Sequence, residues 1–169
     1  MSNPLTTVPR DATKGTGGLA YILIAQYADY TPTIDASGYA TFTPSSSTNW
    51  IKVVPRKETS SFSDDAKTDI KNGSVVWNQK VEMVFSRYQQ VLRNNIKYMG
   101  NSEFIAVAVD QNSQAWLLGY PNGLDMITST AGSGTAPGDL NGSKISLEGN
   151  QSQPAALVAA ATLSTITPS

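Results

Sequence analysis

The chain has 169 residues, with 12 Lys and Arg against 13 Asp and Glu, and it contains neither His nor Cys. This length is typical of one domain, whose core supports folding without disulfides or metals. The absent residue types exclude a disulfide, a thiolate nucleophile, a Ser-His-Asp triad and a zinc finger. A net charge of −1 argues against a dedicated nucleic-acid-binding protein. Charged residues make up 15% of the chain, below the roughly 25% of typical domains. We therefore expect no enzyme and no cofactor or metal site.

The N-terminal residues 1–18 are rich in Pro and Gly and poor in large apolar side chains. They lack the apolar core of a signal peptide, and the apolar stretch at residues 19–25 is too short to span a membrane, so we expect no membrane association. We expect this segment to form an extended arm that packs on the domain or on neighbouring subunits. Gly15, Gly17 and Gly18 precede a predicted strand, the reverse of the order in a phosphate-binding loop.

The body, residues 19–149, has mostly the pattern of strands. Apolar, branched and aromatic residues predict strands at residues 19–27, 39–43 and 50–54. Residues 75–85 alternate strictly, with Val81 and Met83 on one face and Lys80 and Glu82 on the other. With the turn Lys71-Asn72-Gly73 the alternation predicts a long hairpin over residues 59–85. Further strands are expected at residues 103–109, 115–120, 124–130 and 144–147, with a long loop at 132–142.

One helix is predicted, at residues 86–99. Its apolar residues recur every three or four positions (Phe85, Tyr88, Leu92, Ile96 and Met99), and Gly100 takes the position of a C-cap. The basic residues Arg87, Arg93 and Lys97 fall on the rest of the helix surface. They form either a solvated face or a contact with an acidic patch of a neighbouring subunit.

The acidic residues Asp64, Asp65 and Asp69 form the chain's one acidic cluster, and Lys67 and Lys71 lie between and after them. Paired carboxylates serve in cation binding and in acid-base catalysis, but no third catalytic residue type lies nearby. We therefore expect a solvated hairpin or loop, whose tip is either exposed to solvent or touches a partner.

Several weaker patterns have structural explanations. Asp110-x-Asn112 and Asp139-x-Asn141-Gly142 resemble the opening of a calcium loop but lack its remaining ligands, so both predict turns. A short basic group, Lys52, Arg56 and Lys57, is expected to be solvated. The aromatic residues in the strands (Tyr21, Tyr27, Trp77 and Trp116) are expected in the core, with a carbohydrate-binding surface as the alternative.

The order of these elements resembles that of phage virion proteins with the tail-tube fold. The stretch FIAVAVDQNSQAWLLG, which starts at Phe104, is similar to the C-terminal half of such proteins, as are the glycine-rich crossover and the DLNG turn after it. Similar sequences occur in phages of Bacteroidetes hosts, including ring proteins of crAss-like phages. Ser113 departs from the pattern, because glycine is commoner at that point of the turn.

This resemblance implies a mainly β protein: a β-sandwich or partial β-barrel with one flanking helix, an extended arm and a long hairpin. It implies a structural subunit of closed homo-oligomeric rings in a phage tail or neck, assembled in the bacterial cytoplasm. The partners would be copies of the chain, neighbouring ring or portal proteins, and DNA in transit. In that family the long hairpin contributes to the lumen or the next ring, and N-terminal arms bridge rings. The matching segments here are residues 59–73 and 1–18. The C-terminal segment, residues 150–169, is expected to pack on the domain or on a neighbour.

Two other structural functions remain open from the sequence. One is a capsid decoration or head–tail completion protein, and the other is a glycan-binding fibre module. In a tail-tube or neck-ring protein, a lumen lined by Asp64, Asp65 and Asp69 would repel DNA phosphates.

Overall fold

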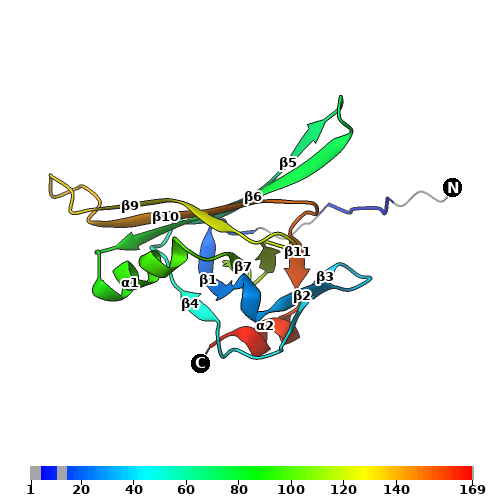
Figure 1. The fold of residues 1–169 in the computed structure, drawn as a ribbon, viewed down its shortest axis with the longest axis horizontal. Coiled ribbons are helices and arrows are strands. Elements are labelled where there is room, and N and C mark those ends of the chain that lie inside the picture. Colours follow the sequence, from blue (N-terminus) through cyan, green and yellow to red (C-terminus); the bar gives the residue numbers. More distant parts are fainter. Residues whose placement is uncertain (1–4, 11–14, 169) are drawn as a thin grey trace.

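A computed structural model describes residues 5–10 and 15–168. Parts of the predicted arm, residues 1–4 and 11–14, lie outside the described residues. The chain is mainly β, with 47% strand and 12% helix, which confirms the fold class predicted from the sequence. Figure 1 shows two sheets packed as layers, with the short helices against them. Neither helix in the described residues is long and apolar enough to cross a lipid bilayer.

The larger sheet has seven strands in the order β2-β3-β11-β8-β7-β1-β4. Their bounds are β1 Leu19–Gln26, β2 Thr31–Ile34, β3 Tyr39–Thr43, β4 Ile51–Val53, β7 Phe104–Asp110, β8 Ala115–Leu118 and β11 Ala156–Val158. The inner strand β7 is buried at six successive positions, from Phe104 to Val109, because both faces of this sheet are covered.

The smaller sheet has four antiparallel strands in the order β5-β6-β10-β9. They are β5 Ser61–Asp69, β6 Ser74–Ser86, β9 Asp125–Gly132 and β10 Gly142–Gln151. The predicted hairpin is therefore confirmed, and β5 and β6 project beyond the body of the molecule (Figure 1). The alternation of β6 is confirmed as well, since Val81 and Met83 are fully buried while Lys80 and Glu82 are partly exposed.

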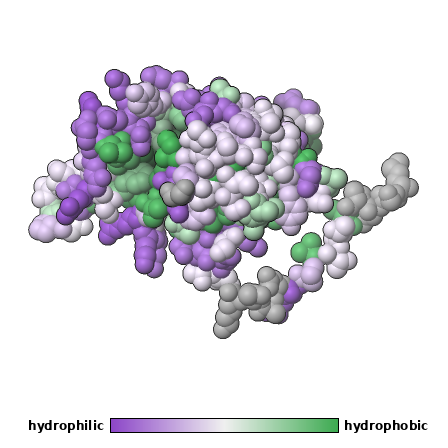
Figure 2. Space-filling model, turned by 90° about the horizontal axis from the view of Figure 1, so that it is seen from below, coloured by the Kyte–Doolittle hydropathy of each residue, from purple (hydrophilic) through white to green (hydrophobic). Residues whose placement is uncertain are grey.

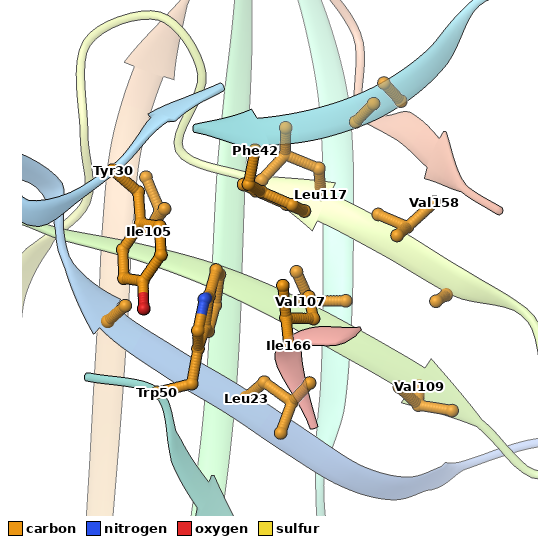
Figure 3. Packing of buried hydrophobic residues seen from close by; sticks show 14 residues of the cluster. Leu23, Tyr30, Phe42, Trp50, Ile105, Val107, Val109, Leu117, Val158 and Ile166 are labelled. Carbon is orange, nitrogen blue, oxygen red and sulfur yellow. The ribbon is translucent and has the colours of Figure 1, made fainter. Parts of the chain in front are cut away.

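Two apolar clusters lie on opposite faces of the large sheet, because successive side chains of a strand point to opposite sides. One fills the space between the sheets and includes Ile22, Ala106, Met83 and Leu147. The other lies on the far face, where Trp50 contacts Tyr30 and Phe42 at ring-centroid distances of 5.1 Å in both cases. Figure 3 shows this second cluster around Leu23, Ile105 and Val107.

The helix α1 (Gln90–Met99) starts four residues later than predicted. Phe85 and Ser86 remain in the β6–β10 ladder, and Arg87 has a φ of 64°, which is incompatible with a helix start there. Leu92, Ile96 and Met99 pack on the cluster between the sheets as predicted, and Gly100 is the C-cap, but Tyr88 precedes the helix and is 46% exposed.

The C-terminal segment packs on the domain. Strand β11 pairs with β8 and, in parallel, with β3, while the second helix α2 (Ala160–Ile166) buries Ile166 completely. The sequence analysis missed α2, β11, β2 and the short 3-10 helix η1 (Tyr27–Asp29). It also made β10 too short, since that strand runs from Gly142 to Gln151.

Candidate functional site: surfaces for assembly

The hairpin separates the acidic residues that the sequence places together. In β5 the alternation puts Asp65, Lys67 and Asp69 on the outward face of the small sheet and Asp64 on the inward face. Asp64 Oδ2 accepts a hydrogen bond from the backbone N–H of Ala155 at 2.8 Å, and its Oδ1 is buried without a partner. Asp64 therefore ties β5 to the segment before β11 and does not join an acidic cluster.

Asp69 forms the turn of the hairpin. Its Oδ1 accepts hydrogen bonds from the backbone N–H groups of Lys71 and Asn72, at 3.0 and 3.3 Å, and its Oδ2 accepts one from Asn72 Nδ2 at 2.7 Å. This is the usual role of an Asp that begins a turn. Next to the turn, Ile70 is 91% exposed at the tip of the hairpin, an unusual position for a large apolar side chain in a solvated loop.

The outward face of the small sheet carries a network of charges. Glu82 lies 2.8 Å from Lys80 and 3.3 Å from Lys144 (carboxylate oxygen to Nζ). Hydrogen bonds from Lys80, which has the larger effect, and from Lys144 lower the pKa of Glu82. The hydrogen bond to Glu82 in turn raises the pKa of Lys80. The strand registers place five carboxylates and three ammonium groups on this face: Asp65, Asp69, Glu82, Asp125 and Glu148 with Lys67, Lys80 and Lys144. The face is polar and slightly acidic.

Strands β5 and β9 form the two edges of the small sheet. They have nine and eight residues, and β9 is exposed along almost its whole length. A long exposed edge presents a row of unpaired backbone donors and acceptors, which is a template for pairing with another strand. The small sheet therefore offers two surfaces for β-augmentation.

The predicted basic helix face is only partly formed. Arg93 and Lys97 are exposed one turn apart on α1, and neither forms an ion pair with the described residues. Arg87 lies outside the helix, where its backbone N–H donates to Asn141 O at 2.6 Å. The prediction that all three share a helix face is therefore wrong for Arg87, because β6 continues to Ser86.

Of the two predicted Asp turns, the one at Asp110 is confirmed, whereas the one predicted from Asp139 to Gly142 lies earlier, at residues 135–139, because Gly142 already begins β10. Asp110 Oδ1 accepts hydrogen bonds from the backbone N–H groups of Asn112 and Gln114, each at 2.8 Å, and Ser113 has the positive φ of 65° that favours glycine. Asp139 accepts from the N–H groups of Ala136 and Thr135, which lowers its pKa. In the described part of the chain, no group of three or more Asp or Glu residues is placed to hold a metal ion.

The remaining basic group, Lys52, Arg56 and Lys57, lies on β4 and in the connection after it. Lys52 Nζ lies 4.4 Å from the centroid of the Tyr21 ring, a cation–π contact across neighbouring strands. Arg56 and Lys57 are exposed in the connection after β4, where the Arg56 backbone N–H donates to Val84 O at 2.8 Å. Arg56 and Lys57 are therefore solvated, as expected from the sequence, and Lys52 also contacts an aromatic ring.

Comparison with known proteins finds no matching family model, curated sequence or solved structure.

The sequence analysis missed two buried amides that hold the loop between β8 and β9. Gln79 Oε1 accepts a hydrogen bond from Gly119 N at 2.8 Å. Gln151 accepts one from Asn122 N and donates one to Gly123 O, both at 2.7 Å. Gln79 stands in the apolar face of the β6 alternation, and a polar residue in such a face is the available sign that it satisfies buried backbone groups.

Proposed function

We propose that the chain is a non-enzymatic structural subunit that assembles with copies of itself into closed rings of a phage tail tube or neck, through which DNA passes. The observation that carries the proposal is the small sheet, which has two unpaired edges and one polar face turned away from the core. This arrangement is expected of a β-sheet that continues from one copy to the next by pairing of its edge strands.

The strand directions suit such a continuation. Successive strands of the small sheet are antiparallel, so β9 runs opposite to β5. A second copy added in the same orientation brings its β5 beside β9 of the first, and the two strands pair in antiparallel fashion. The contact joins different surfaces of the two copies, and a head-to-tail contact of this kind generates a ring when its rotation closes.

The charge of the outward face suits a channel. A lumen lined by this face carries more carboxylates than ammonium groups and no guanidinium, so it repels the phosphates of a passing duplex. In this proposal Asp65 and Asp69 line the lumen, and Asp64 does not, since it faces inward. Neighbouring ring or portal proteins would contact the exposed hairpin tip around Ile70. The virion would be the final location, after assembly in the cytoplasm of a bacterial host.

Imaging tests the ring directly. We expect rings or tubes of the purified protein in negative-stain electron micrographs. We expect the double variant Thr128→Lys/Thr130→Lys, which adds charge along the β9 edge, to remain monomeric in sedimentation velocity. Ala161→Lys adds the same charge on exposed α2 and serves as the control that should assemble. Isolated globules or trimers of the unaltered protein would refute the ring.

The channel face has a separate test. Asp65 and Asp125 are exposed on the outward face and form no turn, so reversing both to Lys should leave the fold intact. We expect assembled rings of this variant to retain duplex DNA in an electrophoretic assay at low salt, and unaltered rings to leave it free. Equal retention by both proteins would refute the role of this face.

A further inference from the structure

A cavity of about 450 Å³ opens beside the C-terminal end of β1. Its walls come from β1, from the segment before β4 and from the C-terminal half of α1, and they include Gln26, Asn49, Ile51 and Tyr98. Figure 2 shows hydrophobic side chains gathered around a hollow on the side of the molecule that carries α1. The volume lies within the range of about 300–1,000 Å³ that is usual for pockets that hold small molecules.

The cavity exists because two paired strands diverge. Strand β1 pairs with β7 as far as Gln26, but its pairing with β4 on the other side ends at Ile24↔Ile51. The chain before β4 turns away, with Trp50 N donating to Ser47 O at 3.2 Å, and the Trp50 side chain enters the core. The position of the cavity is therefore fixed by the register of the large sheet.

Neutral polar residues from three parts of the chain line this cavity. Gln26 ends β1, Asn49 precedes β4, and Asn95 lies on α1. None of these three side-chain amides forms a hydrogen bond with the described residues, and Asn49 is bonded through its backbone N–H, which donates to Tyr30 Oη at 3.3 Å. Each amide offers a carbonyl acceptor and an NH₂ donor. The wall therefore carries both donors and acceptors, which suits hydroxyl groups, because a hydroxyl also donates and accepts.

Aromatic residues form part of the same wall. Tyr98 is 69% exposed near the end of α1, so most of its side chain is open to a ligand. Trp50 is 3% exposed, and its Nε1 is buried without a hydrogen-bond partner among the described residues. A pyranose sugar has one face of C–H groups that packs on the electron-rich face of an aromatic ring, while its hydroxyls point outwards. An exposed ring beside unpaired amides is the combination that such a sugar needs.

The charge of the cavity limits the class of ligand. Asp29 is the one charged residue in the described wall, and it forms no ion pair with the described residues. This carboxylate would repel an anion, since no Lys or Arg in the described wall offsets it. An apolar ligand would take water from the three amides without replacing their hydrogen bonds. A neutral ligand with several hydroxyls has neither cost, and Asp29 can accept hydrogen bonds from neighbouring hydroxyls.

We propose that this cavity binds a neutral saccharide of the size of a mono- or disaccharide. The sugar ring packs on Tyr98, and its hydroxyls bond with the side-chain amides and with Asp29. The described wall includes no residue of the small sheet, so this binding does not depend on the edge pairing proposed above.

Saturation-transfer NMR tests the binding, with methyl glucoside, methyl galactoside and N-acetylglucosamine as the probes. We expect saturable binding within this set, with a Kd on the order of 1 mM for so small a ligand. Putrescine and inorganic phosphate are the comparison probes for a cation and an anion, and we expect both to bind more weakly than the sugar.

Neighbouring residues of the same type supply matched variants that test the location. Asn95→Ala removes an amide from the wall, whereas Asn94→Ala removes one from the exposed helix surface next to it. Tyr98→Ala removes the ring, whereas Tyr88→Ala removes an exposed tyrosine outside the wall. We expect Asn95→Ala and Tyr98→Ala each to weaken sugar binding about three- to ten-fold. The two controls should leave the Kd unchanged, and Tyr98→Phe, which keeps the ring, should retain most of the binding.

Three results overturn the proposal. They are the absence of saturable binding for all the sugars tested, an equal loss of binding in the control variants, and tighter binding of putrescine or phosphate than of any sugar. Failure of this proposal is distinguishable from failure of the ring. Rings that do not bind sugar refute the saccharide site alone, whereas sugar binding by a protein that forms no rings refutes the ring alone.

Discussion

Replacing Gln151 by Leu should destabilise the protein strongly. The Gln151 side chain is 1% exposed and bonds two backbone groups of the β8–β9 loop, Asn122 N and Gly123 O, each at 2.7 Å. Leucine has a similar size but leaves both groups unpaired. An unsatisfied buried polar group costs about 1–3 kcal/mol, and Asn122 has some access to water, so we expect a loss of about 2–4 kcal/mol. At this chain length the loss lowers Tm by roughly 5–15 °C.

A second substitution at the same position separates hydrogen bonding from packing. In Gln151→Glu one carboxylate oxygen still accepts from Asn122 N, but the other faces Gly123 O, which also only accepts. Protonation restores a donor, so the folded state raises the pKa of this carboxyl. The loss of unfolding free energy in this variant is therefore largest at neutral pH. It becomes smaller as the pH falls through the raised pKa of the folded state towards the unfolded value near 4.3.

Equilibrium unfolding in urea, followed by tryptophan fluorescence, measures both effects. The matched control is Gln153→Leu, which makes the same chemical change at an exposed side chain two residues after the end of β10. All variants are compared at a concentration where they share one oligomeric state. If Gln151→Leu unfolds at the same urea concentration as Gln153→Leu, or if the deficit of Gln151→Glu is independent of pH, the reasoning is refuted.

Three further predictions concern stability. Gly142→Ala should lose about 1–3 kcal/mol or more in urea unfolding, because a Cβ at this position would lie 1.9 Å from a backbone oxygen of β6. Glu82→Gln should be less stable than the unaltered protein at neutral pH, and the gap should close as pH falls below 4.5, since hydrogen bonds from two lysines lower the folded pKa of Glu82. Asp64→Ala should lower Tm by several degrees in calorimetry, because it removes the acceptor of the part-buried N–H of Ala155.

Each of these predictions has its own control and contrary outcome. Gly132 lies opposite Gly142 in the ladder and has open space at the Cβ position, so Gly132→Ala should be tolerated, and equal losses would contradict the steric explanation. For Glu82, 1 M salt should reduce the difference in unfolding free energy between the unaltered protein and Glu82→Gln at neutral pH. An unchanged difference would exclude an ionic origin. Asp65→Ala changes the same residue type on the outward face, and it should have little effect on Tm if Asp64 acts through its backbone contact.

The sequence predicts the long elements well because their patterns are repeated many times. The two-residue period of β6 recurs through Val81 and Met83, and packing between the sheets reinforces it. The strands β2 and β11 were missed because neither has a strand-like sequence. Strand β2 contains Pro32, which argues against a strand. Strand β11 lies in the Ala-, Ser- and Thr-rich C-terminal segment, and its conformation depends on pairing with β8 and β3, which are distant in sequence.

The errors at the candidate site have equally local causes. Tyr88 fits the helical spacing of Leu92 and Ile96, so the sequence extends α1 backwards, but the ladder with β10 keeps the chain extended as far as Ser86. The separation of Asp64 from Asp65 was available from the sequence, because neighbouring residues of a strand point to opposite faces. The cavity lined by Gln26, Asn49 and Ile51 could not be predicted from the sequence, because it depends on where the pairing between β1 and β4 ends.

The β5–β6 hairpin belongs to a four-stranded sheet at its base and is a two-stranded ribbon at its tip. Pairing between β6 and β10 ends at Trp77↔Gln151, and from Val76 to the tip each strand has only the other as a neighbour. A two-stranded ribbon twists more than a wider sheet and is only marginally stable without further support. The tip is consequently more compliant than the body of the molecule. In the ring proposed above, this compliance would let the tip bend to meet neighbouring copies at different angles, so that the rigid body would tolerate small differences in curvature and spacing.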